Sequence, residues 1–145
     1  MPIGFLKLYT SVDRKELQAL RNILGFIPAN YALYRLALRH KSVANDINNK
    51  GIKNSNERLE FLGDAMLGSV IAAHLYKKVP TGDEGYLTKM RSKIVSRTSL
   101  NQLAKKIGLD ALVIAKLDKK SKTDSIYGNA FEALIGAIYL DKGTS

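Results

Sequence analysis

The sequence lacks several residue types, and each absence narrows the chemistry open to this chain. Among its 145 residues there is no Cys and no Trp, and there are only two His and three Pro. Without Cys, disulfides and thiolate metal sites are excluded, and two His are too few for most zinc sites. Any bound metal ion must therefore rely on oxygen ligands. The absence of Cys also fits a reducing compartment, so we expect a cytoplasmic protein.

Long hydrophobic runs are absent as well. The first seven residues hold no apolar stretch long enough for a signal peptide. The longest apolar run covers fifteen residues, 126–140, and contains Asn129 and Glu132. A bilayer span needs about 20 predominantly apolar residues. The run therefore predicts a core helix, and we expect no membrane insertion.

Positive charge is in clear excess. The chain has 23 Lys and Arg against 13 Asp and Glu, a formal net charge of +10. Such a surplus is an argument about partners rather than about the fold, and nucleic acids are the first candidates. A surface that is merely rich in lysine explains the same surplus. Charge alone leaves both interpretations open.

Helical periodicity dominates, which predicts a single all-α domain over residues 1–145. The composition, 46% hydrophobic and 25% charged, is ordinary for a globular protein. No linker, internal repeat or second domain is visible, and polar loops are expected at 43–55 and 117–123. The expected helices cover residues 13–24, 30–41, 56–78, 98–107 and 125–140, with a further helix from the turn at 81–85 to about 95.

Three acids mark the helix expected at 56–78. Glu57, Glu60 and Asp64 are spaced i, i+3 and i+7, so they fall on one side of the helix within about 60°. Leu67 and Ile71 continue the same side toward the end of the helix. An exposed charged face does not turn apolar in this way. We therefore expect a helix that is buried on nearly all sides.

Phe61 lies beside these acids, where an exposed polar face has no use for an aromatic ring. Buried carboxylates need cations, because an unpaired buried charge is costly. Arg58 can serve one acid but not three. Structural ion pairs and a metal site are the two interpretations that remain.

Glu132 is the single charge in the helix expected at 125–140. Asn129 and Gly136 lie on the same side of that helix, and an amide oxygen can also ligate a hard cation. Helical carboxylate sites are built in this way, from two helices that both present oxygen ligands inward. Such ligands favour Mg²⁺ or Mn²⁺ over zinc and iron, although a buried pair of Glu132 with a Lys or Arg is the alternative.

A carboxylate-bound pair of divalent ions suits phosphodiester hydrolysis, because one ion activates the attacking water and the other stabilises the leaving oxygen. The positive surplus supplies cations that hold a phosphate backbone. Neither clue is specific alone. Together they predict a nuclease.

The ten-residue segment 56–65, Asn-Glu-Arg-Leu-Glu-Phe-Leu-Gly-Asp-Ala, resembles the signature of ribonuclease III, the family of Dicer and Drosha. Segments 37–42, 82–85, 91–95 and 132–141 resemble other parts of that family in order and spacing. The resemblance covers about residues 16–143. It implies an all-α endonuclease fold that forms a homodimer and cuts double-stranded RNA, leaving 5′-phosphates and 3′-overhangs, as in ribosomal and messenger RNA processing.

The resemblance also implies roles for single residues. His40 is a candidate general base, although a hydrogen bond at a helix end is the simpler role for it. Gly63 marks a close approach of helices, and Phe61 inserts into the partner subunit. We expect no small-molecule cofactor beyond Mg²⁺, with Mn²⁺ as a substitute. The expected catalytic residues are Asp64 and Glu132, the metal ligands are Glu60, Asp64, Asn129 and Glu132, and the accessory acids are Glu57 and Glu84.

Two departures from the family pattern bear on activity. Residue 129 is Asn, where most of the family carries Asp, so one negative charge is lost and metal affinity is expected to fall. A catalytically silent RNA-binding scaffold is the alternative that this substitution supports. The chain also ends at Ser145 without the usual double-stranded-RNA-binding domain and without the last helix of the catalytic domain. We therefore expect weaker and more salt-sensitive RNA binding.

Overall fold

The computed structural model describes residues 11–44, 54–116 and 125–143, and it confirms the all-α class. Over these residues the only β-type pairing is an isolated bridge between Arg39 and Ile114. The helices are α1 (Ser11–Leu24), α2 (Tyr31–Ala37), α3 (Glu57–Lys78), α4 (Glu84–Ile94), α5 (Arg97–Lys106) and α6 (Ile126–Lys142), with short 3₁₀ turns η2 (Lys41–Val43) and η3 (Leu109–Ala111).

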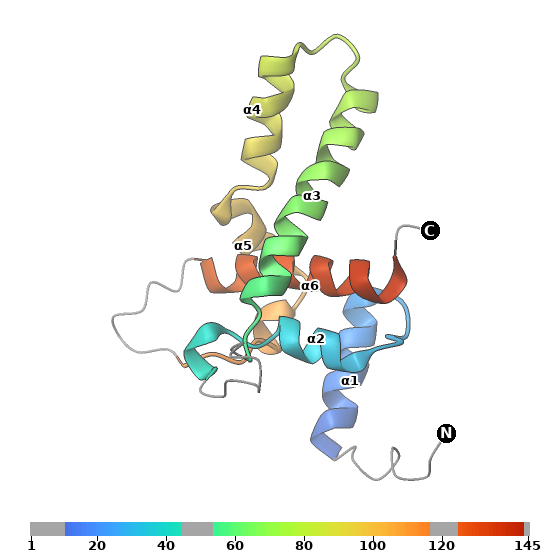
Figure 1. Ribbon diagram of the computed structural model, residues 1–145, viewed down its shortest axis with the longest axis vertical. Coiled ribbons are helices and arrows are strands. Elements are labelled where there is room, and N and C mark those ends of the chain that lie inside the picture. The colour runs from blue at the N-terminus through green and yellow to red at the C-terminus, as the bar shows by residue number, and fades with distance from the viewer. Residues whose placement is uncertain (1–10, 45–53, 117–124, 144–145) are drawn as a thin grey trace.

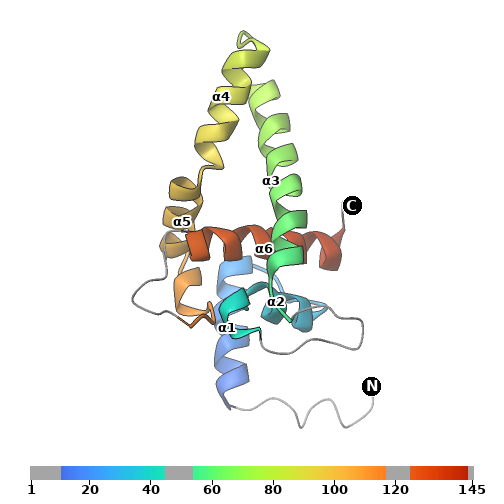
Figure 2. The same ribbon diagram turned by 60° about the vertical axis from the view of Figure 1, so that its left-hand side comes forward.

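Helix α6 is the centre of the domain, and the other helices are arranged around it (Figure 1). Helices α1 and α2 lie on one side of α6, and α5 packs beside its N-terminal half. Helix α3 crosses α6 and then continues away from the domain as one arm of a hairpin whose other arm is α4 (Figures 1 and 2). The molecule is therefore a packed helical base from which the α3–α4 hairpin projects.

Small residues on α6 let its neighbours come close. Ala130, Ala133 and Ala137 are fully buried, and they are short enough for other helices to pack directly on the α6 backbone. The remaining core side chains come from every part of the base. The largest of them are Leu20, Tyr34, Leu38, Leu59, Leu109 and Leu134.

Two glycines define the crossing of α3 and α6. A Cβ atom on Gly63 would overlap the carbonyl oxygen of Glu132, and one on Gly136 would overlap the carbonyl oxygen of Leu59. The two backbones therefore touch at this point, which confirms the close approach expected at Gly63. The contact fixes α3 and α6 in register, with acids of both helices beside it.

The C-terminal turn of α6 is fastened to the start of α2 by Asp141. Its carboxylate accepts hydrogen bonds from the backbone amides of Ala29 (3.1 Å) and Asn30 (2.8 Å) and from the hydroxyl of Tyr34 (2.7 Å). Burial opposes ionisation, but these hydrogen bonds favour the charged form and hold the pKa of Asp141 below its usual value. The carboxylate thereby satisfies two backbone amides immediately before the first residue of α2.

The expected helix 30–41 was too long. Helix α2 ends at Ala37, because the chain then pairs with a distant segment: His40 N donates to Ile114 O (3.0 Å), and Ile114 N donates to Leu38 O (2.9 Å). Residues 41–43 form the separate turn η2. The other expected helices match to within two residues at the ends that the sequence defined.

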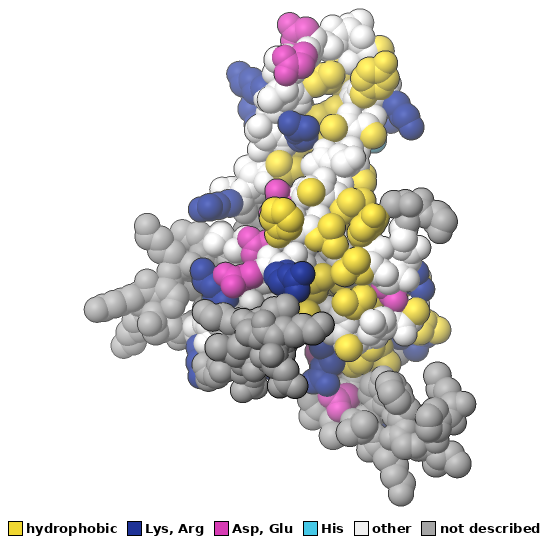
Figure 3. All heavy atoms as spheres, in the orientation of Figure 1, with side chains coloured by type: hydrophobic (Ala, Val, Ile, Leu, Met, Phe, Trp, Pro, Cys, Tyr) yellow, Lys and Arg dark blue, Asp and Glu magenta, His cyan; other side chains and the backbone are white. Residues whose placement is uncertain are grey.

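The expectation that α3 is buried on nearly all sides was wrong for this chain. Phe61, Val70 and Tyr76 are 81%, 59% and 75% exposed. Val70 and Tyr76 lie on the part of α3 that projects from the helical base, whereas Phe61 lies near the crossing on a side that α6 does not cover. In the view of Figure 3, apolar side chains follow α3 toward α6.

The loops expected at 43–55 and 117–123 fall largely or wholly outside the described residues. Among the helices in the described ranges, none combines the length and the apolar character required to span a bilayer.

Candidate active site

The α3–α6 crossing brings three of the expected metal ligands together. Glu60 and Asp64 lie just before and just after Gly63 on α3, and Gly63 sits directly against the backbone of Glu132. Asp64 and Glu132 share a side-chain hydrogen bond. Residues 68 positions apart in sequence thus form an acid pair, with the carboxylate of Glu60 beside it.

A hydrogen bond between two carboxyl groups requires a proton, and the raised pKa of Glu132 lets it supply one below neutral pH. Burial raises the pKa of Glu132 to about 7, and the neighbouring charges of Asp64 and Glu60 add to the rise. Arg97 acts in the opposite direction. Glu132 is therefore only partly ionised near neutral pH.

Glu60 is affected by the same crowding. Burial raises the pKa of Glu60, the charges of Glu57 and Asp64 raise it further, and Lys41 and Arg97 lower it. The charges of the acids thus influence one another, and the basic groups that lower the pKa of Glu60 come from η2 and α5.

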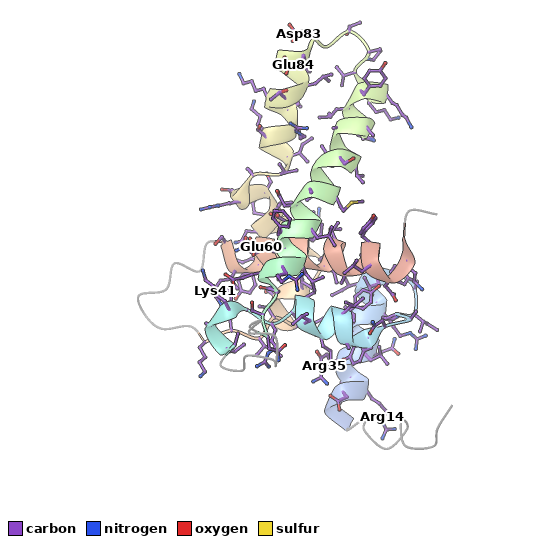
Figure 4. All side chains as sticks on the ribbon, viewed as in Figure 1. Arg14, Arg35, Lys41, Glu60, Asp83 and Glu84 are labelled. Atoms are coloured by element: carbon purple, nitrogen blue, oxygen red, sulfur yellow. The ribbon has the colours of Figure 1, made fainter. Side chains whose placement is uncertain are left out.

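The structure does not support structural ion pairs as the purpose of these acids. Over the described residues, no Lys or Arg lies within salt-bridge distance of Glu60, Asp64 or Glu132, and Arg58 is exposed. The ion pairs that do occur join Arg35 to Asp13 and Glu16, in the α1–α2 part of the molecule (Figure 4).

The donor set at the crossing fits a hard divalent cation in its chemistry, because carboxylate oxygens are what Mg²⁺ binds. The side chains are not arranged as a closed cage: within the described ranges, no three His, Asp or Glu side chains converge closely enough to hold a metal ion as they stand. The residues at the crossing therefore match a divalent cation in the type of their ligand atoms and in their place on the two helices, but not yet in a closed arrangement of side chains.

A model of the ribonuclease-III-like family matches residues 30–145, most of the chain. The chain belongs to this family. Two curated relatives support the assignment. Ribonuclease 3 of Flavobacterium psychrophilum is 52% identical over 139 residues, which cover 96% of this chain and 56% of the relative. Ribonuclease 3 of Zunongwangia profunda is 55% identical over 124 residues, which cover 86% of this chain and 51% of the relative.

The chain spans about half the length of the curated relatives it matches. Among solved structures, it is similar to the nuclease domain of ribonuclease III from Campylobacter jejuni, with a TM-score of 0.74 and 32% identity over 88% of this chain and 87% of that one. It is also similar to Dicer from Pichia stipitis, with a TM-score of 0.61 and 30% identity over 81% of this chain and 49% of that one. The family's nuclease-domain fold is therefore present over almost the whole chain.

The remaining expected site residues of this family member lie at different distances from the acid pair. Asn129 is one helical turn before Glu132 on α6 and is partly buried. Glu57 opens α3, where its carboxylate accepts a hydrogen bond from Ser55 Oγ (3.5 Å). Glu84 opens α4 at the far end of the hairpin, and within one chain it is not brought to the other acids (Figure 4).

His40 has the simpler of its two expected roles. Its Nδ1 accepts a hydrogen bond from the backbone amide of Ser42 (3.2 Å) and lies 2.8 Å from Ser42 Oγ, so the side chain caps η2. Burial lowers the pKa of His40, Lys41 lowers it further, and Glu57 opposes both. The ring is thus a neutral hydrogen-bonding group near pH 7.

Sequence reasoning missed the two basic residues beside the acids. Lys41 stands in a segment that resembles the family, but its spacing from Glu60 gives no hint of proximity. Arg97 belongs to no recognised motif. Only the tertiary arrangement of η2, α3 and α5 reveals both.

Proposed function

We propose that this chain is the catalytic domain of an endoribonuclease that hydrolyses phosphodiester bonds of double-stranded RNA with Mg²⁺, for which Mn²⁺ can substitute. The observation that carries the proposal is the α3–α6 crossing at Gly63, which puts Asp64 in hydrogen-bond contact with Glu132 beside Glu60. Membership in the ribonuclease-III-like family supports the same reaction.

The metal site that we propose consists of Glu60, Asp64 and Glu132, with the amide oxygen of Asn129 as a neutral fourth ligand. A bound divalent ion would lower the pKa of an attacking water and stabilise charge on the leaving oxygen. Asp64 and Glu132 are suited to hold it, because a cation between their neighbouring carboxyl groups would favour the ionised form of both.

The finer features of the proposal come from the family. We expect products with 5′-phosphates and 3′-overhangs, a homodimer in which Phe61 contacts the partner, and a cytoplasmic role on ribosomal and messenger RNA precursors. The high exposure of Phe61 supports the homodimer. So does the Campylobacter jejuni nuclease domain, which is described as having a region involved in dimer formation.

Asn129 supports the second candidate function, a scaffold that binds RNA but does not cut it. Loss of one carboxylate weakens the attraction of the site for Mg²⁺. Against this alternative stand the three acids at the crossing, which the chain retains although they crowd one another.

Cleavage of long duplex RNA with and without Mg²⁺ separates the two functions. We expect cleavage only with Mg²⁺ and little action on duplex DNA, whose groove shape differs and which lacks 2′-hydroxyls. Glu132→Gln should reduce the rate by roughly a hundredfold or more while RNA binding persists. Asp110→Asn removes an exposed acid outside the site and should leave the rate unchanged.

Asn129→Asp sharpens the same assay. It restores a carboxylate one turn from Glu132, so cleavage at low Mg²⁺ should hold or increase. No cleavage by the wild-type chain, together with activity in Asn129→Asp, would favour the silent scaffold. Full activity of Glu132→Gln would remove Glu132 from the site.

A further inference from the structure

Two exposed basic residues stand near the acids, on elements other than those that carry the acids. Arg97 is the first residue of α5, and Lys41 is the first residue of η2. Their charges act on the acids: Arg97 lowers the pKa of both Glu60 and Glu132, whereas Lys41 lowers that of Glu60.

Backbone packing fixes the position of Arg97. One turn further along α5, the backbone of Asn101 and the side chain of Leu100 lie 3.2 and 3.3 Å from where a Cβ on Gly128 would be. Gly128 is one turn before Glu132 on α6. Helix α5 is therefore docked against α6 immediately beside the acids, and its first residue cannot move far from them.

Hydrogen bonds fix the position of Lys41. Asn56, the residue before α3, donates from its backbone amide to Arg39 O (2.8 Å) and from its side chain to Ala37 O (2.9 Å). Asn56 is itself buried. The segment that carries Lys41 is thereby tied to the first turn of α3, where Glu60 lies (Figure 4).

Neither basic side chain contributes an interaction that holds the described part of the fold together. Both are exposed, and neither has an ion pair or a hydrogen bond from its side chain over the ranges that the structure describes. Arg97 also sits in the first turn of α5, where the helix dipole disfavours a positive charge. Ser96 already caps this terminus by accepting from Ser99 N (3.2 Å). A cation placed there is not needed for folding, and an external anion would satisfy it.

We propose that Lys41 and Arg97 bind RNA phosphates beside the site, so that a neighbouring phosphate lies over Asp64 and Glu132. This inference rests on the proposed function. It adds the groups that bind the substrate, one on η2 and one at the start of α5. Lys41 and Arg97 act in binding and positioning.

The test compares Lys41→Gln, Arg97→Gln and Arg97→Lys with wild type in the 145-residue chain. Lys106→Gln is the matched control, because Lys106 is an exposed cation at the other end of α5. Binding of a labelled RNA duplex is measured by fluorescence anisotropy in Ca²⁺ over a series of salt concentrations, and cleavage is measured in Mg²⁺. Far-ultraviolet circular dichroism checks that each variant is folded.

We expect each Gln variant to weaken RNA binding by roughly threefold to tenfold and to reduce the slope of log affinity against log salt by about one. In cleavage the loss should appear in KM more than in kcat. Arg97→Lys should recover most of the slope, and Lys106→Gln should match wild type.

Unchanged RNA affinity and salt slope in folded Arg97→Gln, together with tighter Mg²⁺ binding, would overturn the proposal. Arg97 would then be only a counter-charge for the acids. Equal losses in Lys106→Gln would also overturn it, since the effect would come from general surface charge. A wild-type chain that binds duplex RNA but fails to cut it leaves the flanking cations intact and refutes the nuclease function instead. No RNA binding by wild type would overturn both.

Discussion

Two opposing effects act on the carboxyl group of Glu132: cation binding requires its ionised form, whereas its surroundings favour the protonated form. Glu132 must be ionised to bind a cation, yet its place against the α3 backbone puts it beside Asp64 and Glu60 in a half-buried position. Burial and the neighbouring acids raise the pKa of Glu132 to about 7, so the folded chain keeps a proton on this group in mildly acidic solution. The proposed cation would displace that proton.

The first prediction at the residue scale concerns stability against pH. The pKa of Glu132 is about 7 in the folded chain against an ordinary 4.5, so folding takes up a proton between these values. Stability is then lost as pH rises from about 4.5 to about 7 and stays lower above. Glu132→Gln removes this loss. Without divalent ions it should match wild type near pH 4 and exceed it at pH 8 by about 1–2 kcal/mol, allowing for solvent screening of a half-buried group.

Thermal melting of both chains across this pH range measures the difference, with Asp110→Asn as a control that should show no such trend. Added Mg²⁺ at pH 8 should stabilise wild type more than Glu132→Gln. A constant difference between the two chains at all pH values would show that Glu132 is not protonated in the folded chain.

At the scale of elements, the site depends on how closely α3 and α6 approach. Glu60 and Asp64 face Glu132 only because glycines at 63 and 136 let the two backbones touch. The acids are side chains of rigid helices, so a shift of either helix moves them apart. The same contact therefore serves both folding and the geometry of the acids.

This dependence gives a prediction with an internal control. Gly63→Ala would drive a methyl group into the backbone carbonyl of Glu132, which cannot move unless α6 moves, and should cost about 3 kcal/mol or more. Gly68→Ala lies on the same helix, where a Cβ meets nothing within 4 Å. It should stabilise α3 by about 0.5–1 kcal/mol. Chemical denaturation measures both, and equal effects would contradict the close crossing.

Helices were predictable from the sequence where periodicity agreed with tertiary packing. The two helices that carry the acids have clear signals: Pro80 follows the end of α3, and α6 is a long apolar run. Helix α2 was extended too far because the pairing of Leu38 and His40 with Ile114 is between segments distant in sequence. The proximity of Lys41 and Arg97 to the acids was not predictable for the same reason. A contact between two distant elements does not appear in the hydrophobic periodicity of either element.

The acids themselves were predictable because local spacing places them. Three acids on one helical face and a lone Glu in an apolar helix are features of single elements. Their meeting at Gly63 depends on two elements, and the resemblance to ribonuclease III anticipated it. Spacing within the single chain does not explain Glu84, which stands at the far end of the hairpin (Figure 4).

At the scale of the whole molecule, large apolar side chains of α3 are left uncovered. Phe61, Val70 and Tyr76 are more than half exposed on α3 alone, and Figure 3 shows apolar side chains running along this helix toward α6. Large exposed apolar patches often mark an interface with another protein. A second copy of the chain is the occupant that the family suggests, and its contact with α3 would lie beside the acids.

The final prediction tests this arrangement through Phe61. The ring is 81% exposed next to Glu60, so a partner that covers it would bury an aromatic anchor, typically worth about 2 kcal/mol or more at an interface. Phe61→Ala should therefore raise the dimer dissociation constant by roughly 30-fold, as measured by sedimentation across a range of concentrations. Ile27→Ala is the control, because Ile27 is 63% exposed between α1 and α2, away from α3. If both variants leave the wild-type dimer unchanged, Phe61 contributes little to assembly. If wild type is a monomer at every concentration, the exposed α3 face does not join two copies of this chain.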